Sequence, residues 1–73
     1  YVVDKMQNTI QKFDNDGNFI LKWGGLGSEN GQFIEPHGIT INSSGVVYVA
    51  DSMNHRIQTF TSNGEFLSSF GKS

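Results

Sequence analysis

The sequence has no cysteine and one proline in 73 residues, so disulfide bonds cannot stabilise its fold. A chain this short buries only about 60% of the surface that its unfolded state exposes. No apolar run approaches the roughly 18 residues of a membrane-spanning helix, and we expect any targeting signal to lie outside this sequence. Seven acidic side chains against five basic ones argue against a nucleic-acid surface. Nine glycines, in contrast, indicate many tight turns.

An internal repeat is the strongest pattern in the chain. Shifting the sequence by 47 residues aligns Tyr1 with Tyr48, and ten of the 24 pairs from Tyr1 to Gly24 are then identical. The aligned segments include Tyr1–Met6 on Tyr48–Met53 and Ile10–Phe13 on Ile57–Phe60. A fixed period of this length is typical of repeat architectures such as propellers.

Short apolar segments bounded by turn residues predict strands rather than helices. The second unit contains four of them, near residues 38–41, 46–50, 56–60 and 66–70, whereas the first unit contains only the last three. Asp16-Gly17 and Asn63-Gly64 predict type I′ hairpin turns, because both central residues of that turn need positive φ. Ser43-Ser44-Gly45 predicts another tight turn. The pattern therefore predicts an all-β fold of four-stranded antiparallel meanders, the unit of a β-propeller blade.

The sequence from Phe33 to Ile41, followed by residues 47–58, resembles an NHL repeat, including its Asn-His-x-Ile core at Asn54 to Ile57. The resemblance implies a partial β-propeller from a parent of six blades. Its expected divisions are 1–24 (three strands of one blade), 25–32 (connector), 33–71 (a complete blade) and 72–73 (the next connector). We expect the missing first strand to lie upstream in a longer parent. Two departures occur: Asn42 replaces the usual Asp, and Gln7-Asn8-Thr9 replaces Asn-x-Arg, which predicts looser loop pairing in the first unit.

Antiparallel strands alternate in direction, so the connector and the loop between the second and third strands of a unit emerge at one end. Residues 5–8, 25–35 and 52–55 therefore form what we call the connector face, and the tight turns occupy the opposite end. Longer loops offer side chains for binding. We expect ligand contacts from His37, Ser52, Met53, Asn54 and His55. The resemblance assigns structural roles to Asp51, capping the turn after its strand by accepting loop N–H groups, and to Arg56, crossing to a neighbouring strand.

The expected function is non-enzymatic recognition or scaffolding of a protein or peptide, because the family includes ligase recognition domains, receptor sensors and scaffolds. The alternative is a metal-dependent lyase or hydrolase of the peptidyl-amidating kind, with His37 as a zinc ligand. That reading requires further Pro-His positions in other blades, so no cofactor is expected from this chain alone. Binding of single-stranded RNA is a weaker alternative, because the face carries little positive charge. A catalytic triad of Asp51, His55 and a serine lacks a nucleophile elbow.

Partners expected from the pattern are neighbouring blades of the parent or other copies of the chain, since the first unit lacks a strand and leaves an open edge. Three further motifs have simpler structural readings. Gly24 to Gly31 lacks the helix of a phosphate loop, Asp14 to Gly17 lacks the closing glutamate of a calcium loop, and Asn42-Ser43-Ser44 matches a glycosylation acceptor. We expect seven aromatic residues to form a core between blades: Phe13, Phe19, Trp23, Phe33, Phe60, Phe66 and Phe70.

Overall fold

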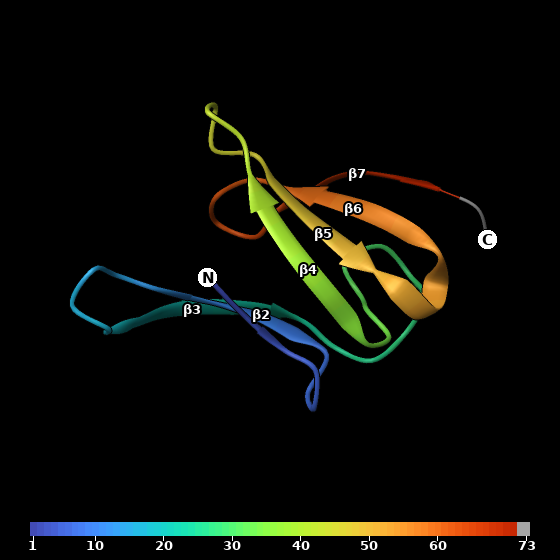
Figure 1. The fold of residues 1–73 in the computed structure, drawn as a ribbon, viewed down its shortest axis with the longest axis horizontal. Coiled ribbons are helices and arrows are strands. Elements are labelled where there is room, and N and C mark those ends of the chain that lie inside the picture. The colour runs from blue at the N-terminus through green and yellow to red at the C-terminus, as the bar shows by residue number, and fades with distance from the viewer. Residues whose placement is uncertain (72–73) are drawn as a thin grey trace.

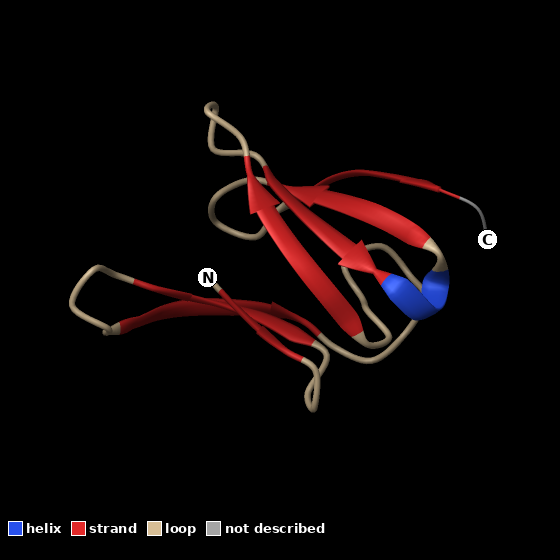
Figure 2. Ribbon diagram, viewed as in Figure 1, coloured by secondary structure: helices blue, strands red, loops and turns tan. Residues whose placement is uncertain are grey.

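The computed structural model describes residues 1–71, which form two antiparallel sheets (Figure 1). The first sheet contains β1 (Val2–Asp4), β2 (Thr9–Phe13) and β3 (Phe19–Gly24), in that order. The second contains β4 (Pro36–Ile41), β5 (Val47–Asp51), β6 (Arg56–Phe60) and β7 (Phe66–Gly71), with the short 3₁₀ turn η1 (Ser52–Asn54) between β5 and β6 (Figure 2). The predicted all-β meander is confirmed. The connector expected at 72–73 lies outside the described residues.

The two sheets repeat the same strand register. Ile10 lies between Val3 and Trp23 in the first sheet, and Ile57 lies between Ala50 and Phe70 in the second. An irregularity interrupts each ladder at the same place, between Lys12 and Phe13 and between Thr59 and Phe60. The 47-residue repeat of the sequence is therefore also a repeat of backbone pairing.

The predicted type I′ turns are wrong. Only the glycine has positive φ in each hairpin, +84° at Gly17 and +85° at Gly64, and Asp16 and Asn63 are not in that region. The N–H of Gly17 donates to the Asp14 carbonyl, and Gly64 donates to Thr61 in the same way. This is a type I turn followed by a left-handed glycine bulge. Dipeptides of Asn or Asp with Gly fit either turn, because both place glycine at a positive φ.

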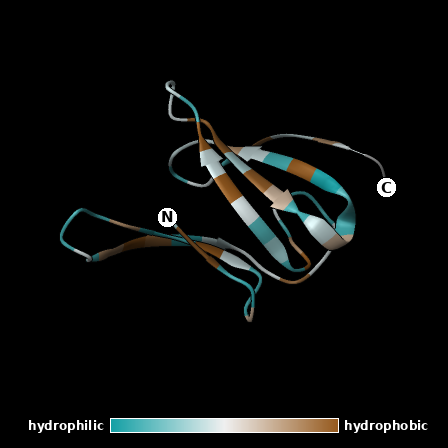
Figure 3. Cartoon of the chain, in the orientation of Figure 1, coloured by the Kyte–Doolittle hydropathy of each residue, from teal (hydrophilic) through white to brown (hydrophobic). Residues whose placement is uncertain are grey.

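The core lies between the sheets and consists of five buried apolar residues: Ile10, Phe33, Val47, Val49 and Phe60. Hydropathy alternates along β4 and β5, as expected for strands with one covered face (Figure 3). Phe60 lies at the centre of this core. The centroid of its ring is 5.5 Å from that of Trp23 and 5.7 Å from that of Phe33. Burying each such side chain contributes about 1.5–3 kcal/mol.

The predicted aromatic core is only partly correct. Phe33 and Phe60 are fully buried, and Phe13, Trp23 and Phe66 are half-buried. Phe19 and Phe70 are 56% and 54% exposed. The reason is that each sheet has one face covered by the other sheet, whereas Phe19 and Phe70 belong to the two outer faces, which no element among residues 1–71 covers.

Gly64 and Gly17 provide a matched test of packing at the hairpin turns. A Cβ at Gly64 would lie 2.6 Å from Trp23 Cε3, whereas a Cβ at Gly17 would meet nothing within 4 Å. We expect Gly17→Ala to cost only the left-handed backbone strain, about 1–2 kcal/mol. Gly64→Ala should cost about 1–3 kcal/mol more, because Trp23 must move. Urea unfolding in dilute solution measures both, and equal losses would contradict the packing of Trp23 on this turn.

Candidate binding face at the connector loops

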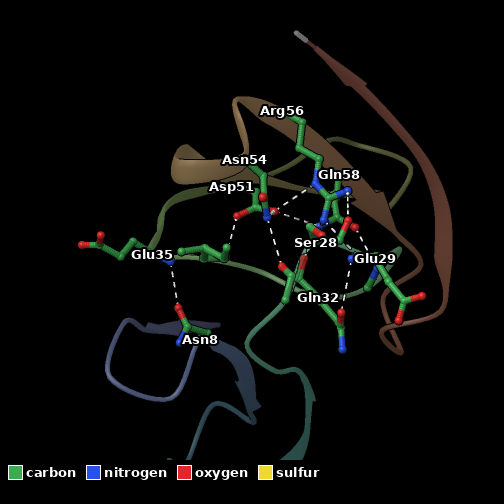
Figure 4. Close-up of polar contacts among 12 residues, drawn as sticks. Asn8, Ser28, Glu29, Gln32, Glu35, Asp51, Asn54, Arg56 and Gln58 are labelled. Atoms are coloured by element: carbon green, nitrogen blue, oxygen red, sulfur yellow. Dashed lines mark hydrogen bonds and ion pairs between the residues drawn. The ribbon is translucent and has the colours of Figure 1, made fainter. Parts of the chain in front are cut away.

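Three loops far apart in sequence meet at one end of the two sheets. The Glu35 N–H donates to Asn8 Oδ1 at 2.8 Å, and the Met53 N–H donates to the Ile34 carbonyl at 3.3 Å. Asn54 Nδ2 donates to the Gly27 carbonyl at 3.1 Å. The connector face expected from strand direction is therefore present, with the connector between the two strand loops (Figure 4).

The carboxylate of Asp51, at the end of β5, organises this end of the molecule. Its side chain is fully buried. Oδ1 accepts the Ile34 N–H at 2.8 Å. Oδ2 accepts Arg56 Nε at 2.9 Å, Asn54 Nδ2 at 2.8 Å and Gln58 Nε2 at 3.3 Å (Figure 4). A buried carboxylate is stable only when it is paired and fully hydrogen-bonded, and both oxygens of Asp51 meet that condition.

Arg56 and Gln58 extend the contacts of Asp51 to the connector backbone. The Arg56 guanidinium donates to the carbonyls of Ser28 at 2.9 Å, Glu29 at 3.0 Å and Gln32 at 2.9 Å. Gln58 donates to the Gln32 carbonyl at 2.6 Å and accepts the Gly31 N–H at 2.9 Å. These side chains give the irregular connector the hydrogen bonds that a sheet would otherwise supply.

These contacts differ in detail from the expected roles. Asp51 makes no side-chain cap to η1 and accepts the Ile34 N–H of the connector instead. Arg56 reaches connector carbonyls, rather than a neighbouring strand. Gln58 was not singled out from the sequence. The sequence did contain an indication of its role, because Gln11 and Gln58 are identical across the repeat. A polar side chain is thus retained in both units, on a strand that has a covered face.

The first unit carries a reduced version of this arrangement. Asp4, equivalent to Asp51, accepts the N–H groups of Met6 at 3.0 Å and Gln7 at 3.1 Å, and Gln11 Nε2 at 3.2 Å. Thr9 stands where the second unit has Arg56, and among residues 1–71 this carboxylate has no cation partner. The departure from Asn-x-Arg in the sequence thus corresponds to a simpler set of hydrogen bonds.

The five expected ligand residues separate into two groups. His37, Ser52, Met53 and His55 are exposed, and His55 adopts a left-handed backbone with φ +55°. Asn54 is half-buried, and its amide is bonded to Asp51 and Gly27. Within residues 1–71, no three His, Cys, Asp or Glu side chains are grouped closely enough to hold a metal ion.

Large apolar side chains are exposed on the same loops. Met6 is 92% exposed and Met53 is 56% exposed, and the two residues are equivalent in the repeat. Leu26, on the connector, is 68% exposed. The sequence reasoning selected Met53 but not Met6 or Leu26, although the alignment of Met6 with Met53 could have indicated the pair.

The remaining motifs have structural roles in turns. Asp14 Oδ1 accepts the N–H groups of Asp16 at 2.9 Å and Asn18 at 2.8 Å, and the bond from Asn18 is the main cause that lowers the Asp14 pKa. Asn42 Oδ1 accepts two N–H groups of its own turn in the same way. The glycine-rich segment leads into β4, not into a helix.

Asp51 and Asp4 form a matched pair for measuring the buried carboxylate. Asp51→Ala leaves Arg56, Gln58 and the Ile34 N–H without their acceptor, and we expect it to lower the free energy of unfolding by about 3–5 kcal/mol. Asp4→Ala removes bonds at a more exposed site without a cation, at a cost of about 1 kcal/mol. Urea unfolding followed by circular dichroism gives both values. Equal losses of free energy of unfolding would show that the buried Asp51 stabilises the fold no more than Asp4 does.

Residues 33–60 match the family model of the NHL repeat, and no curated protein matches the chain. No helix among the described residues is long and apolar enough to cross a membrane. The matched segment runs from the buried Phe33 to the buried Phe60 and includes the Asp51, Arg56 and Gln58 contacts. Residues 33–60 are therefore similar to an NHL repeat, and they lie in the four-stranded antiparallel sheet β4-β5-β6-β7, which is consistent with a β-propeller blade.

Proposed function

We propose that the connector face is a non-enzymatic recognition surface for a protein or peptide. The observation that carries the proposal is the exposure of Met6 and Met53, 92% and 56%, at equivalent positions of successive units on one end of the molecule. In this proposal residues 1–24 and 33–71 belong to successive blades, and residues 25–32 connect them.

The physical character of these side chains supports a binding role. Methionine is unbranched and polarisable, so it adapts to partners of different shape, and it is enriched at protein interfaces. Leu26 adds a third exposed apolar side chain, 68% exposed, on the connector. The polar residues His37, Ser52 and His55 are also exposed, and polar residues provide directional contacts at the rim of an interface.

The loops that carry these residues are already held in place. Arg56 and Gln58 bond four backbone groups of the connector, and Asn8 accepts the N–H of Glu35, just after it. A preorganised loop loses less conformational entropy when a partner binds, which favours affinity. Asp51, the acidic member of the triad considered from the sequence, has both oxygens bonded within the chain and is therefore assigned to structure.

Selection from a phage-displayed library of random peptides tests the proposal. We expect peptides selected on the wild-type chain to lose at least about tenfold in affinity for Met53→Glu, because a buried contact is replaced by a charge. Leu67→Glu is the matched control, since Leu67 is 50% exposed on β7 and lies outside the connector loops. Selected peptides that bind both variants equally, or a library that yields no binder, would overturn the proposal.

A further inference from the structure

Both sulfur atoms of the chain lie on the connector face. The sequence has two methionines and no cysteine. Met6 lies in the loop between β1 and β2 and is 92% exposed, and Met53 lies in η1, between β5 and β6, and is 56% exposed. Thioethers and thiols are the side chains that peroxides oxidise most readily. Mild oxidation of this chain therefore acts on the surface that is proposed to bind a partner.

The two methionines are exposed beside neighbouring units that lie on opposite sides of them. Met6 is exposed although the second unit follows it and contacts its loop, where the Glu35 N–H donates to Asn8 Oδ1 at 2.8 Å. Met53 is exposed although the first unit precedes it and the connector contacts its loop through the Ile34 carbonyl. Because the two loops are equivalent in the repeat, a neighbour on either side leaves this position exposed.

Both methionines lie outside the packed core. Among residues 1–71, the buried core and the apolar side chains packed against it include neither of them. Their backbone is held in place, since the Met6 N–H donates to Asp4 Oδ1 at 3.0 Å and the Met53 N–H donates to the Ile34 carbonyl at 3.3 Å. An oxygen atom added to either sulfur therefore displaces no core contact and leaves the loop backbone bonded.

We propose that Met6 and Met53 are a site of reversible oxidation that lowers the affinity of the connector face for its partner. The inference rests on the proposed function, because it assigns a means of regulation to the same recognition surface. Methionine supplies that surface with adaptable apolar contacts. The sulfoxide is polar and chiral, and burying it against an apolar partner costs free energy because its oxygen loses hydrogen bonds to water.

The reaction adds one oxygen atom to each sulfur and consumes one peroxide. A lone pair of the thioether sulfur attacks one oxygen of hydrogen peroxide, so that an S–O bond forms and the O–O bond breaks. The other oxygen takes up the remaining proton and leaves as water. The sulfur is oxidised by two electrons, and the peroxide is reduced by two. Methionine sulfoxide reductases, one for each sulfoxide epimer, reverse the step, with two thiols oxidised to one disulfide and the oxygen released as water.

The indole of Trp23 is a further oxidisable group, but it is held in the packing between the sheets. Trp23 is half-buried, and its ring centroid lies 5.5 Å from that of Phe60. Its Nε1 is buried. Mild peroxide should therefore modify the two methionines before it modifies the core.

Oxidation of the full 73-residue chain with hydrogen peroxide tests the proposal. Mass spectrometry of tryptic fragments should show one added oxygen atom at each methionine, at Met6 before Met53, because Met6 is the more exposed. The circular dichroism spectrum should not change. Peptides selected on the unoxidised chain from the phage-displayed library should lose at least about fivefold in affinity. Both reductases with dithiothreitol should restore that affinity.

The double variant Met6→Leu, Met53→Leu isolates the two sulfur atoms, because leucine is apolar, similar in volume and without sulfur. Peptides are selected on each protein separately, and each protein is compared with itself before and after peroxide. Any effect of the substitutions on affinity itself therefore cancels. Peptides selected on the double variant should bind it equally before and after the treatment.

The outcomes separate the regulation from the recognition surface. Selected peptides that bind the oxidised and the unoxidised chain equally would overturn the regulation and leave the recognition surface in place. A loss of the circular dichroism signal on oxidation, or an equal loss of peptide affinity in the double variant, would overturn it as well. A library without binders, or peptides whose affinity is unchanged by Met53→Glu, would overturn the recognition surface and the regulation together.

Discussion

The buried carboxylate of Asp51 is the constraint on which this structure depends. It has no exposure to solvent and is bonded to Arg56, Asn54, Gln58 and the Ile34 N–H. Removing a carboxylate from water is costly unless its partners are held in place. The same partners bind the connector backbone, so one interaction fixes the end of β5, the loop after it and the irregular segment between the sheets. The connector face has a defined shape for this reason.

The two units of the repeat form different hydrogen bonds at equivalent positions. In the second unit, Arg56 completes the Asp51 cluster and holds three connector carbonyls. In the first unit, Thr9 takes the position of Arg56, and Asp4 bonds its own loop and Gln11. Asn8 then supplies the contact across the units, through the Glu35 N–H. The apolar residues behave in the same way: equivalent side chains are buried or exposed according to which sheet covers them.

The sequence predicts the strands well because period and turn residues are local signals. β6 has the expected bounds, and β4, β5 and β7 differ from expectation by one or two residues. The turn type was wrong because Asp-Gly and Asn-Gly are compatible with two turns. The exposure of Phe19 and Phe70 could not be read from the repeat, since burial depends on the neighbouring sheet. The role of Gln58 was missed because strands are predicted from the spacing of apolar residues, whereas Gln58 is a polar residue that forms hydrogen bonds with the connector backbone.

Amide hydrogen exchange tests the central claim most directly, because it reports each backbone hydrogen bond separately. The Ile34 N–H is bonded to Asp51 and the Gly31 N–H to Gln58, although both residues lie in a segment without strand pairing. We predict that both amides exchange as slowly as those of the buried strand β5. Exchange as fast as that of amides in the exposed turn at Ser43 and Ser44 would contradict the view that Asp51 holds the connector in place.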